Sequence, residues 1–188
     1  MICDVYDNVL ERHTAELIDM QMKEISWKYD YNSTKGGINK HWHTLCGKKE
    51  LFEEYSFLSP IWETAKEKYN FKNKYKVGRF LRVYVNAHTH GIEPHLHYDD
   101  GDFTMIYYPR LDWQPDWMGG TAMWNKQKNE IDRYVNYIGN RLLVFSAKSF
   151  HQAMPVSRQC YELRTCVVFK TMVEDAWVNP DRLDFYKT

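Results

Sequence analysis

The stretch PHLHYDDG at residues 94–101, followed closely by the apolar run FTMIYY at 103–108, decides how the rest of the chain is interpreted. In an extended segment, alternate side chains point to the same face. His97 and Asp99 would therefore point the same way, with one residue between them. Two such groups can bind one metal ion if a third ligand arrives from elsewhere in the fold.

The third ligand is expected to be His151, because no other histidine follows His97 in the sequence. Two imidazoles and one carboxylate on one side of an ion, with open positions opposite, form the facial triad of non-heme Fe(II) sites. His151 follows the apolar run at 140–145 and could instead be a hydrogen-bonded core residue. His95 could replace His97 as a ligand, and a His95–His97 pair without the carboxylate would be a cupin-like alternative.

Length and charge limit the class of protein. The 188 residues, 44% of them hydrophobic, suit one compact domain. We expect this domain to span 1–188, with helical support and flanking strands at 1–74, a strand-rich core at 75–170 and a C-terminal tail at 171–188. The 25 basic and 25 acidic residues cancel. This balance does not resemble the electrostatic footprint of a nucleic-acid binder.

Cysteine usage and hydropathy indicate the compartment. The four cysteines are scattered, without a Cys-x-x-Cys spacing or a disulfide framework, which favours a reducing environment. No apolar run approaches the length of a membrane span, and the first residues lack the features of a signal peptide. We therefore expect a cytoplasmic protein that does not interact with a membrane.

Helical patterns are confined to the first third of the chain. The expected elements are a strand at 2–6, a helix at about 11–24 with Leu17, Met20 and Ile25 on its apolar side, a strand at 25–31, a loop at 32–47, and a helical stretch at 49–69, broken before Pro60, that buries Ile61, Ala65 and Tyr69. His41 and His43 are expected to be unliganded in the polar loop, and His88 and His90 to lie in a loop near the mouth of the site.

Strand patterns dominate from residue 75 onward. At 75–86 one face carries Leu81, Val83 and Val85, and the other carries Arg82, Tyr84 and Asn86, so the second face meets solvent or a polar cavity. Further strands are expected at 80–86, 95–99, 103–108, 120–124, 133–138, 141–145 and 161–170. Many short strands separated by turns indicate an antiparallel sandwich or barrel, and hence a mainly β fold with supporting α-helices.

Arg164 begins the apolar run RTCVVF at 164–169. A buried guanidinium is costly unless it meets an anion, and its fork pairs bidentately with a carboxylate. A dicarboxylate cosubstrate would meet this need; a salt bridge to Glu162 or Asp132 is the alternative.

Two tyrosines could assist Arg164. Tyr108 could share the anion through its hydroxyl group, and Tyr84 could donate a second hydrogen bond. Aromatic core packing is the competing explanation for both tyrosines.

Several motifs then occur in one order: HYD at 97–99, IYY at 106–108 with Asp112-Trp113, Gly119-Gly120, NRLLVF at 140–145, His151 with Pro155, and Arg164. This series, over about residues 78–170, resembles the Fe(II)- and 2-oxoglutarate-dependent dioxygenases. It is most similar to their prolyl-4-hydroxylase-like branch, and small members of this type are similar to bacteriophage-encoded oxygenases.

The resemblance implies a double-stranded β-helix, the cupin-like jelly roll. It implies that His97, Asp99 and His151 bind Fe(II), that Arg164 with Tyr108 beside it binds the distal carboxylate of 2-oxoglutarate, and that Tyr84 lies near the metal-chelating end. The implied reaction uses O₂ to hydroxylate an unactivated C–H bond while 2-oxoglutarate is decarboxylated to succinate, with ascorbate as an optional reductant.

The substrate implied by the resemblance is a peptidyl proline or a similar protein side chain, in the host cytoplasm if a virus encodes the chain. Arg158 competes with Arg164, because the segment between His151 and Arg164 is longer than in the oxygen-sensing hydroxylases. Arg158 could instead contact substrate, together with Trp113, Trp124 and Arg82. Three alternatives stay open: oxidative demethylation of nucleic acid, a small-molecule substrate, and a non-catalytic jelly-roll binding module.

Overall fold

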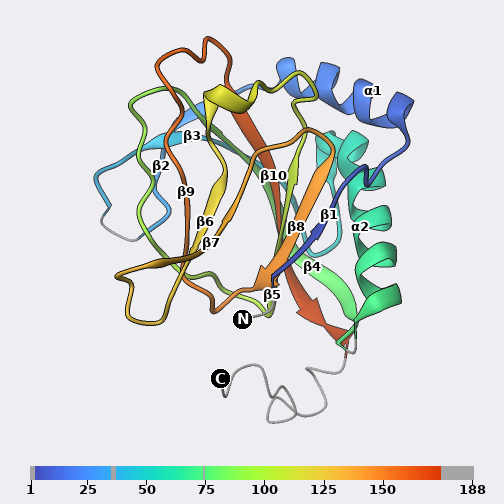
Figure 1. The fold of residues 1–188 in the computed structure, drawn as a ribbon. Coiled ribbons are helices and arrows are strands. Elements are labelled where there is room, and N and C mark those ends of the chain that lie inside the picture. Colours follow the sequence, from blue (N-terminus) through green and yellow to red (C-terminus); the bar gives the residue numbers. More distant parts are fainter. Residues whose placement is uncertain (1–2, 35–36, 74, 175–188) are drawn as a thin grey trace.

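The fold consists of two facing β-sheets with two α-helices on the outer side of the larger sheet (Figure 1). The computed structural model describes residues 3–34, 37–73 and 75–174. In chain order the elements are β1 (Cys3–Tyr6), α1 (Arg12–Lys23), β2 (Lys28–Tyr31), β3 (His41–Lys48), the 3₁₀ helix η1 (Glu53–Leu58), α2 (Ser59–Lys72), β4 (Val77–His88), β5 (Phe103–Tyr108), the 3₁₀ turn η2 (Pro115–Trp117), β6 (Thr121–Trp124), β7 (Ile131–Val135), β8 (Arg141–Ser146), β9 (His151–Ala153) and β10 (Arg164–Val173).

Strand order places distant parts of the chain side by side. The larger sheet has seven strands in the order β1-β8-β5-β10-β4-β3-β2, and the smaller has three in the order β7-β6-β9. All of the strand pairs are antiparallel. The last strand, β10, lies between β5 and β4 at the centre of the larger sheet, so residues from three segments share its inner face.

The central strands are covered on both faces. All six residues of β5 are buried. Phe103, Met105 and Tyr107 belong to the core under the helices, whereas Ile106 and Tyr108 belong to a second core between the sheets. A strand buried on both sides has a nearly continuous apolar sequence instead of an alternating one. The strand predicted at 103–108 is confirmed.

The N-terminal third differs from the prediction in two places. The predicted loop at 32–47 is wrong in its second half, because His41–Lys48 forms β3 and pairs with both β2 and β4. The predicted apolar side of the first helix is wrong for Leu17 and Met20, which are 44% and 62% exposed, whereas Ile25, just after α1, is buried as expected. The buried face instead carries Ala15, Ile18 and Met22 together with Asp19, whose carboxylate lies 3.0 Å from the buried Arg110 side chain.

The second helical region agrees with the sequence pattern. It divides into η1 and α2 just before Pro60, which lies in the first turn of α2. Ile61, Ala65 and Tyr69 are each at most 1% exposed, as expected from their spacing.

Segment 95–99 is not a strand; there only His97 forms a β-bridge, with His151. Strand β9 was not predicted, because its three residues are too few to show the alternation of a strand in the sequence. The predicted tail begins within β10, which continues to Val173, and residues 175–188 lie outside the described ranges. The single-domain assignment stays a prediction.

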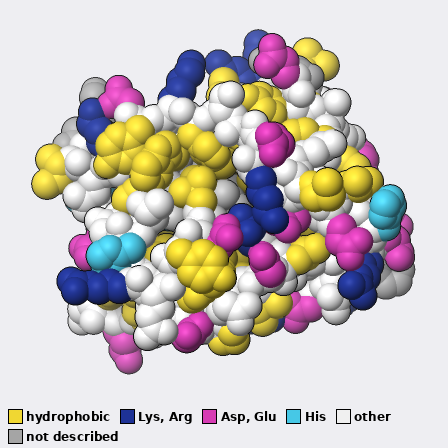
Figure 2. Space-filling model, turned by 90° about the horizontal axis from the view of Figure 1, so that it is seen from above, with side chains coloured by type: hydrophobic (Ala, Val, Ile, Leu, Met, Phe, Trp, Pro, Cys, Tyr) yellow, Lys and Arg dark blue, Asp and Glu magenta, His cyan; other side chains and the backbone are white. Residues whose placement is uncertain are grey.

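The surface shows no field of one sign on the face seen from above. Lys, Arg, Asp and Glu side chains are interspersed there among hydrophobic groups (Figure 2). Within the described ranges, none of the helices combines the length and apolar character that crossing a membrane requires.

Asn140 attaches the segment before α1 to the start of β8. Its side chain accepts a hydrogen bond from the Leu10 N–H and donates one to the Leu10 carbonyl, both at 2.9 Å. Its own carbonyl accepts from the Val9 N–H at 3.1 Å. The φ of Asn140 is +59°, in the left-handed region that asparagine tolerates better than most residues.

We predict that Asn140→Ala lowers the free energy of unfolding by about 2–5 kcal/mol, because each buried polar group of Leu10 left unpaired costs about 1–3 kcal/mol. Urea titration measures the change. Asn129→Ala, in the exposed turn after β6, should change it by less than about 0.5 kcal/mol. Equal losses in the two variants would contradict the role of Asn140.

Candidate functional site

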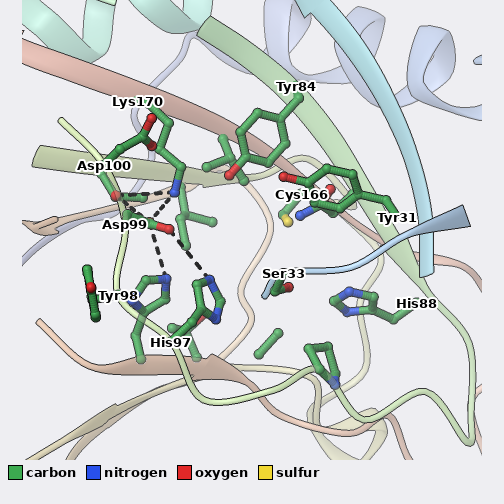
Figure 3. A pocket seen from close by; sticks show the side chains of 18 of the residues that line it. Tyr31, Ser33, Tyr84, His88, His97, Tyr98, Asp99, Asp100, Cys166 and Lys170 are labelled. Carbon is green, nitrogen blue, oxygen red and sulfur yellow. Dashed lines mark hydrogen bonds and ion pairs between the residues drawn. The ribbon is translucent and has the colours of Figure 1, made fainter. Parts of the chain in front are cut away.

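His97, Asp99 and His151 converge in a pocket between the two sheets. One ligand atom from each lies within 4.8 Å of the others. The His97 Nε2 is 3.5 Å from Asp99 Oδ1, and the His151 Nε2 is 3.3 Å from Asp99 Oδ2, as the dashed lines in Figure 3 mark. Two nitrogens and one carboxylate directed at a common point are the donor set of a facial metal site.

Backbone hydrogen bonds position these three residues. The His97 N–H donates to the His151 carbonyl at 3.1 Å, and the His151 N–H donates to the His97 carbonyl at 2.8 Å. The Asp99 N–H donates to the Ala147 carbonyl at 2.7 Å. The irregular segment 94–101 is therefore fixed against the ends of β8 and β9 at its ligand positions.

The tautomers of both histidines suit metal binding. The His97 Nδ1 lies 2.8 Å from the His95 carbonyl, and the His151 Nδ1 lies 3.0 Å from the Ser149 carbonyl. A carbonyl can only accept, so each Nδ1 carries the proton and each Nε2 keeps its lone pair. Burial lowers the pKa of His151 to about 4, which keeps this ring neutral near pH 7.

Lys170 is a charged residue of the pocket that the sequence patterns did not indicate. Its side chain is 2% exposed, and its ammonium group forms an ion pair with Asp99 Oδ2 (Figure 3). The Thr104 hydroxyl donates to the same oxygen at 2.6 Å. Burial by itself would raise the pKa of Asp99, but the adjacent His151 and Lys170 reverse this and the pKa lies below its usual range.

A sequence signal for Lys170 exists. Arg164, Cys166, Val168 and Lys170 alternate along β10, and all four line the pocket. Both faces of β10 are buried, so its nearly continuous apolar sequence makes this period of two hard to recognise.

Arg164 lies in the same pocket, which has a volume of about 230 Å³. Arg164 is 1% exposed. It donates to the Gly119 carbonyl and to Cys166 Sγ, and one of its terminal nitrogens lies 3.2 Å from His88 Nδ1. Among the residues that the structure describes, no carboxylate pairs with Arg164. The alternative salt bridge to Glu162 is wrong, because Glu162 pairs with Arg110 at 3.0 Å.

The two tyrosines differ in their availability. Tyr84 is 6% exposed and lines the pocket. Tyr108 is fully buried, and its hydroxyl is hydrogen-bonded to Thr121 Oγ1 at 2.7 Å. The Tyr108 ring centre lies 5.9 Å from the Arg164 guanidinium carbon. Tyr108 therefore contacts Arg164 through its ring, and its hydroxyl already has a partner.

The candidate substrate residues are spread more widely. Arg82 lines the pocket and forms two 2.7 Å hydrogen bonds to Asp100. Trp113 is buried and donates to the Met118 carbonyl. Trp113, Trp124 and Arg158 are not among the residues that line this pocket, and Arg158 is exposed on the segment before β10.

Three other histidines can be placed by the structure. His95 is not part of the ligand cluster, which leaves the cupin-like pair without support. His41 lies on β3 and is fully buried, not on a polar surface loop. His88 is the last residue of β4, is 3% exposed, and borders the pocket.

No protein-family model and no curated protein matches this sequence. Solved structures do match. A prolyl hydroxylase from Trichoplax adhaerens, in complex with a hypoxia inducible factor peptide fragment, has a TM-score of 0.65 and 16% identity over 90% of this chain and 82% of its own. An oxidoreductase of the 2OG-Fe(II) oxygenase family from Burkholderia pseudomallei has a TM-score of 0.63 and 12% identity over 89% and 83%.

The 2-oxoglutarate complex of a viral collagen prolyl hydroxylase from Paramecium Bursaria Chlorella virus-1 has a TM-score of 0.60 and 14% identity over 90% of this chain and 94% of its own. The predicted double-stranded β-helix, or jelly roll, is thereby confirmed as the fold. The resemblance stated from the motifs agrees with these matches: the chain is similar in structure to prolyl hydroxylases and to 2OG-Fe(II) oxygenase family proteins.

Proposed function

We propose that this chain is an Fe(II)- and 2-oxoglutarate-dependent dioxygenase. The observation that carries the proposal is the cluster of His97, Asp99 and His151 in one pocket with Arg164, a buried cation that has no carboxylate partner among the described residues. A metal centre and a carboxylate-binding arginine in one small cavity suit a chelating diacid.

The donor set fits Fe(II). Two neutral imidazoles and a carboxylate satisfy a divalent first-row metal and leave positions open for other ligands. Thr104 and Lys170 both bind Oδ2 of Asp99, so Oδ1 is the oxygen left for the metal. When bound, Fe(II) with 2-oxoglutarate would supply the O₂ chemistry that hydroxylates a C–H bond while the cosubstrate becomes succinate.

The chain's own residues would orient the cosubstrate. Arg164 would bind its distal carboxylate through charge-assisted hydrogen bonds. Tyr84, whose ring lies 5.6 Å from the Lys170 ammonium group, would contact the end nearer the metal. The burial of Arg164, Tyr84 and Lys170 keeps bulk water out of this region.

A peptidyl proline, or a similar protein side chain, is the proposed substrate. The similarity to a prolyl hydroxylase that was solved with a peptide fragment supports this choice. Tyr98 at the pocket rim is 59% exposed, and its ring packs edge-on against Phe150, which leaves an aromatic surface for a peptide.

We predict that anaerobic addition of Fe(II) and 2-oxoglutarate produces a weak visible charge-transfer band, measured by absorption spectroscopy. His97→Ala should abolish the band because it removes a ligand. His13→Ala, on the exposed side of α1, should keep it. A wild-type protein with no band and no succinate formation would favour the non-catalytic binding module.

We predict that Lys170→Met destabilises the metal-free protein by about 3–5 kcal/mol, because it leaves the buried Asp99 carboxylate without its cation. Thermal unfolding followed with and without Mn(II) measures this. Added Mn(II) should recover more stability in Lys170→Met than in wild type, since the ion compensates the same carboxylate. Lys40→Met, which removes an exposed ion pair, is the control and should leave the midpoint unchanged. A Lys170→Met midpoint equal to wild type would contradict the role of this ion pair.

We predict that incubation with Fe(II), ascorbate and 2-oxoglutarate adds one oxygen atom to a proline-containing peptide, detected by mass spectrometry. Asp99→Ala should form no product. Product on a single-stranded oligonucleotide or a small molecule, with none on peptides, would replace the peptide proposal by one of the other substrate classes.

A further inference from the structure

The end of the pocket opposite the candidate metal site contains a buried histidine beside Arg164. His88 on β4 and Arg164 on β10 are register partners across the two strands. Figure 3 shows His88 on the far side of the pocket from Asp99 and Lys170. His88 is 3% exposed and Arg164 is 1% exposed, so each polar group there needs a partner inside the protein.

The contact between the two side chains determines the tautomer of His88. A terminal nitrogen of Arg164 lies 3.2 Å from His88 Nδ1. A guanidinium group can only donate, so Nδ1 accepts and the ring proton is on Nε2. Burial, with the nearby Arg164 charge, lowers the pKa of His88 well below its usual value, and the ring is neutral.

The Nε2–H of His88 is a buried donor without an acceptor among the described residues. Leaving such a donor unpaired is costly. Arg164 at the same place lacks a carboxylate partner within the described part of the chain. Tyr108 is not among the residues that line the cavity, and its hydroxyl is hydrogen-bonded to Thr121. A buried unpaired donor and a cation without a carboxylate partner border one cavity, and an anion with two oxygens would satisfy both groups.

We infer that His88 is the second residue that binds the distal carboxylate of the cosubstrate, donating through Nε2–H to one oxygen while Arg164 binds the carboxylate from the other side. This assignment rests on the proposed function and replaces the role expected for the Tyr108 hydroxyl. A neutral donor suits the position, since Arg164 already supplies the one positive charge that a single carboxylate needs. Arg164 also has a second role, because its hydrogen bond to Nδ1 orients the His88 ring.

The test compares two ligands that differ only in the distal carboxylate. Calorimetric titration of the Mn(II)-loaded protein would measure the Kd of 2-oxoglutarate and of 2-oxobutyrate, which lacks that group. In His88→Phe, the Kd of 2-oxoglutarate should rise about 10- to 100-fold, the range for a lost hydrogen bond to a charged group. The Kd of 2-oxobutyrate should stay the same. His88→Gln, whose amide can still donate, should recover part of the loss.

His90→Phe is the matched control, because His90 is an exposed histidine two residues further along. It should bind both ligands as wild type does. If His88→Phe binds 2-oxoglutarate as tightly as wild type, or weakens both ligands equally, the inference is wrong while the proposed function stands. If wild-type protein loaded with Mn(II) binds no 2-oxoglutarate, the proposed function fails, and the inference fails with it.

Discussion

The structure depends on the compensation of one buried carboxylate. Asp99 is 7% exposed, and an ionised group in that position is tolerated only if surrounding groups replace water. Thr104 on β5, Lys170 on β10 and the two histidines from the smaller-sheet side provide this environment. Because these groups come from both sheets, correct packing of the jelly roll and assembly of the site are the same event.

The alternation of side chains along central strands makes this possible. On β10, Val167 and Phe169 belong to the core under the helices, while Arg164 and Lys170 face the pocket. The apolar face stabilises the sheet by about 1.5–3 kcal/mol for each large side chain buried. The helices cover the apolar face of the larger sheet. The stability gained there offsets the free-energy cost of burying Arg164 and Lys170 on the opposite face.

Part of this organisation was predictable from the sequence. The run at 103–108 indicated β5, and the spacing of His97 and Asp99 with the later His151 indicated the group that the structure brings together, although segment 95–99 is not a strand. The burial of Arg164 was predictable, because a charged residue at the start of an apolar strand is unusual.

The remaining features depend on partners that are distant in the sequence. β3 has no apolar alternation and is stabilised by its pairing with β2 and β4. His88 looked like a loop residue because its strand continues further than the alternating pattern. The hydrogen-bonding state of His88 depends on Arg164, its register partner 76 positions later in the sequence. The buried face of α1 likewise combines the apolar Ala15, Ile18 and Met22 with Asp19, whose ion pair with Arg110 could not be foreseen from the helix alone.

The reciprocal backbone hydrogen bonds between His97 and His151 have a consequence for how this framework accommodates change. The spacing of the two rings, whose centroids are 4.4 Å apart, is set by main-chain atoms and not by the sequence of the connecting loops. Replacements in the loops between the two histidines can therefore change the loop surface while the spacing of the two rings is retained. Variation in the surrounding loops is in this way separated from the spacing of the candidate metal ligands.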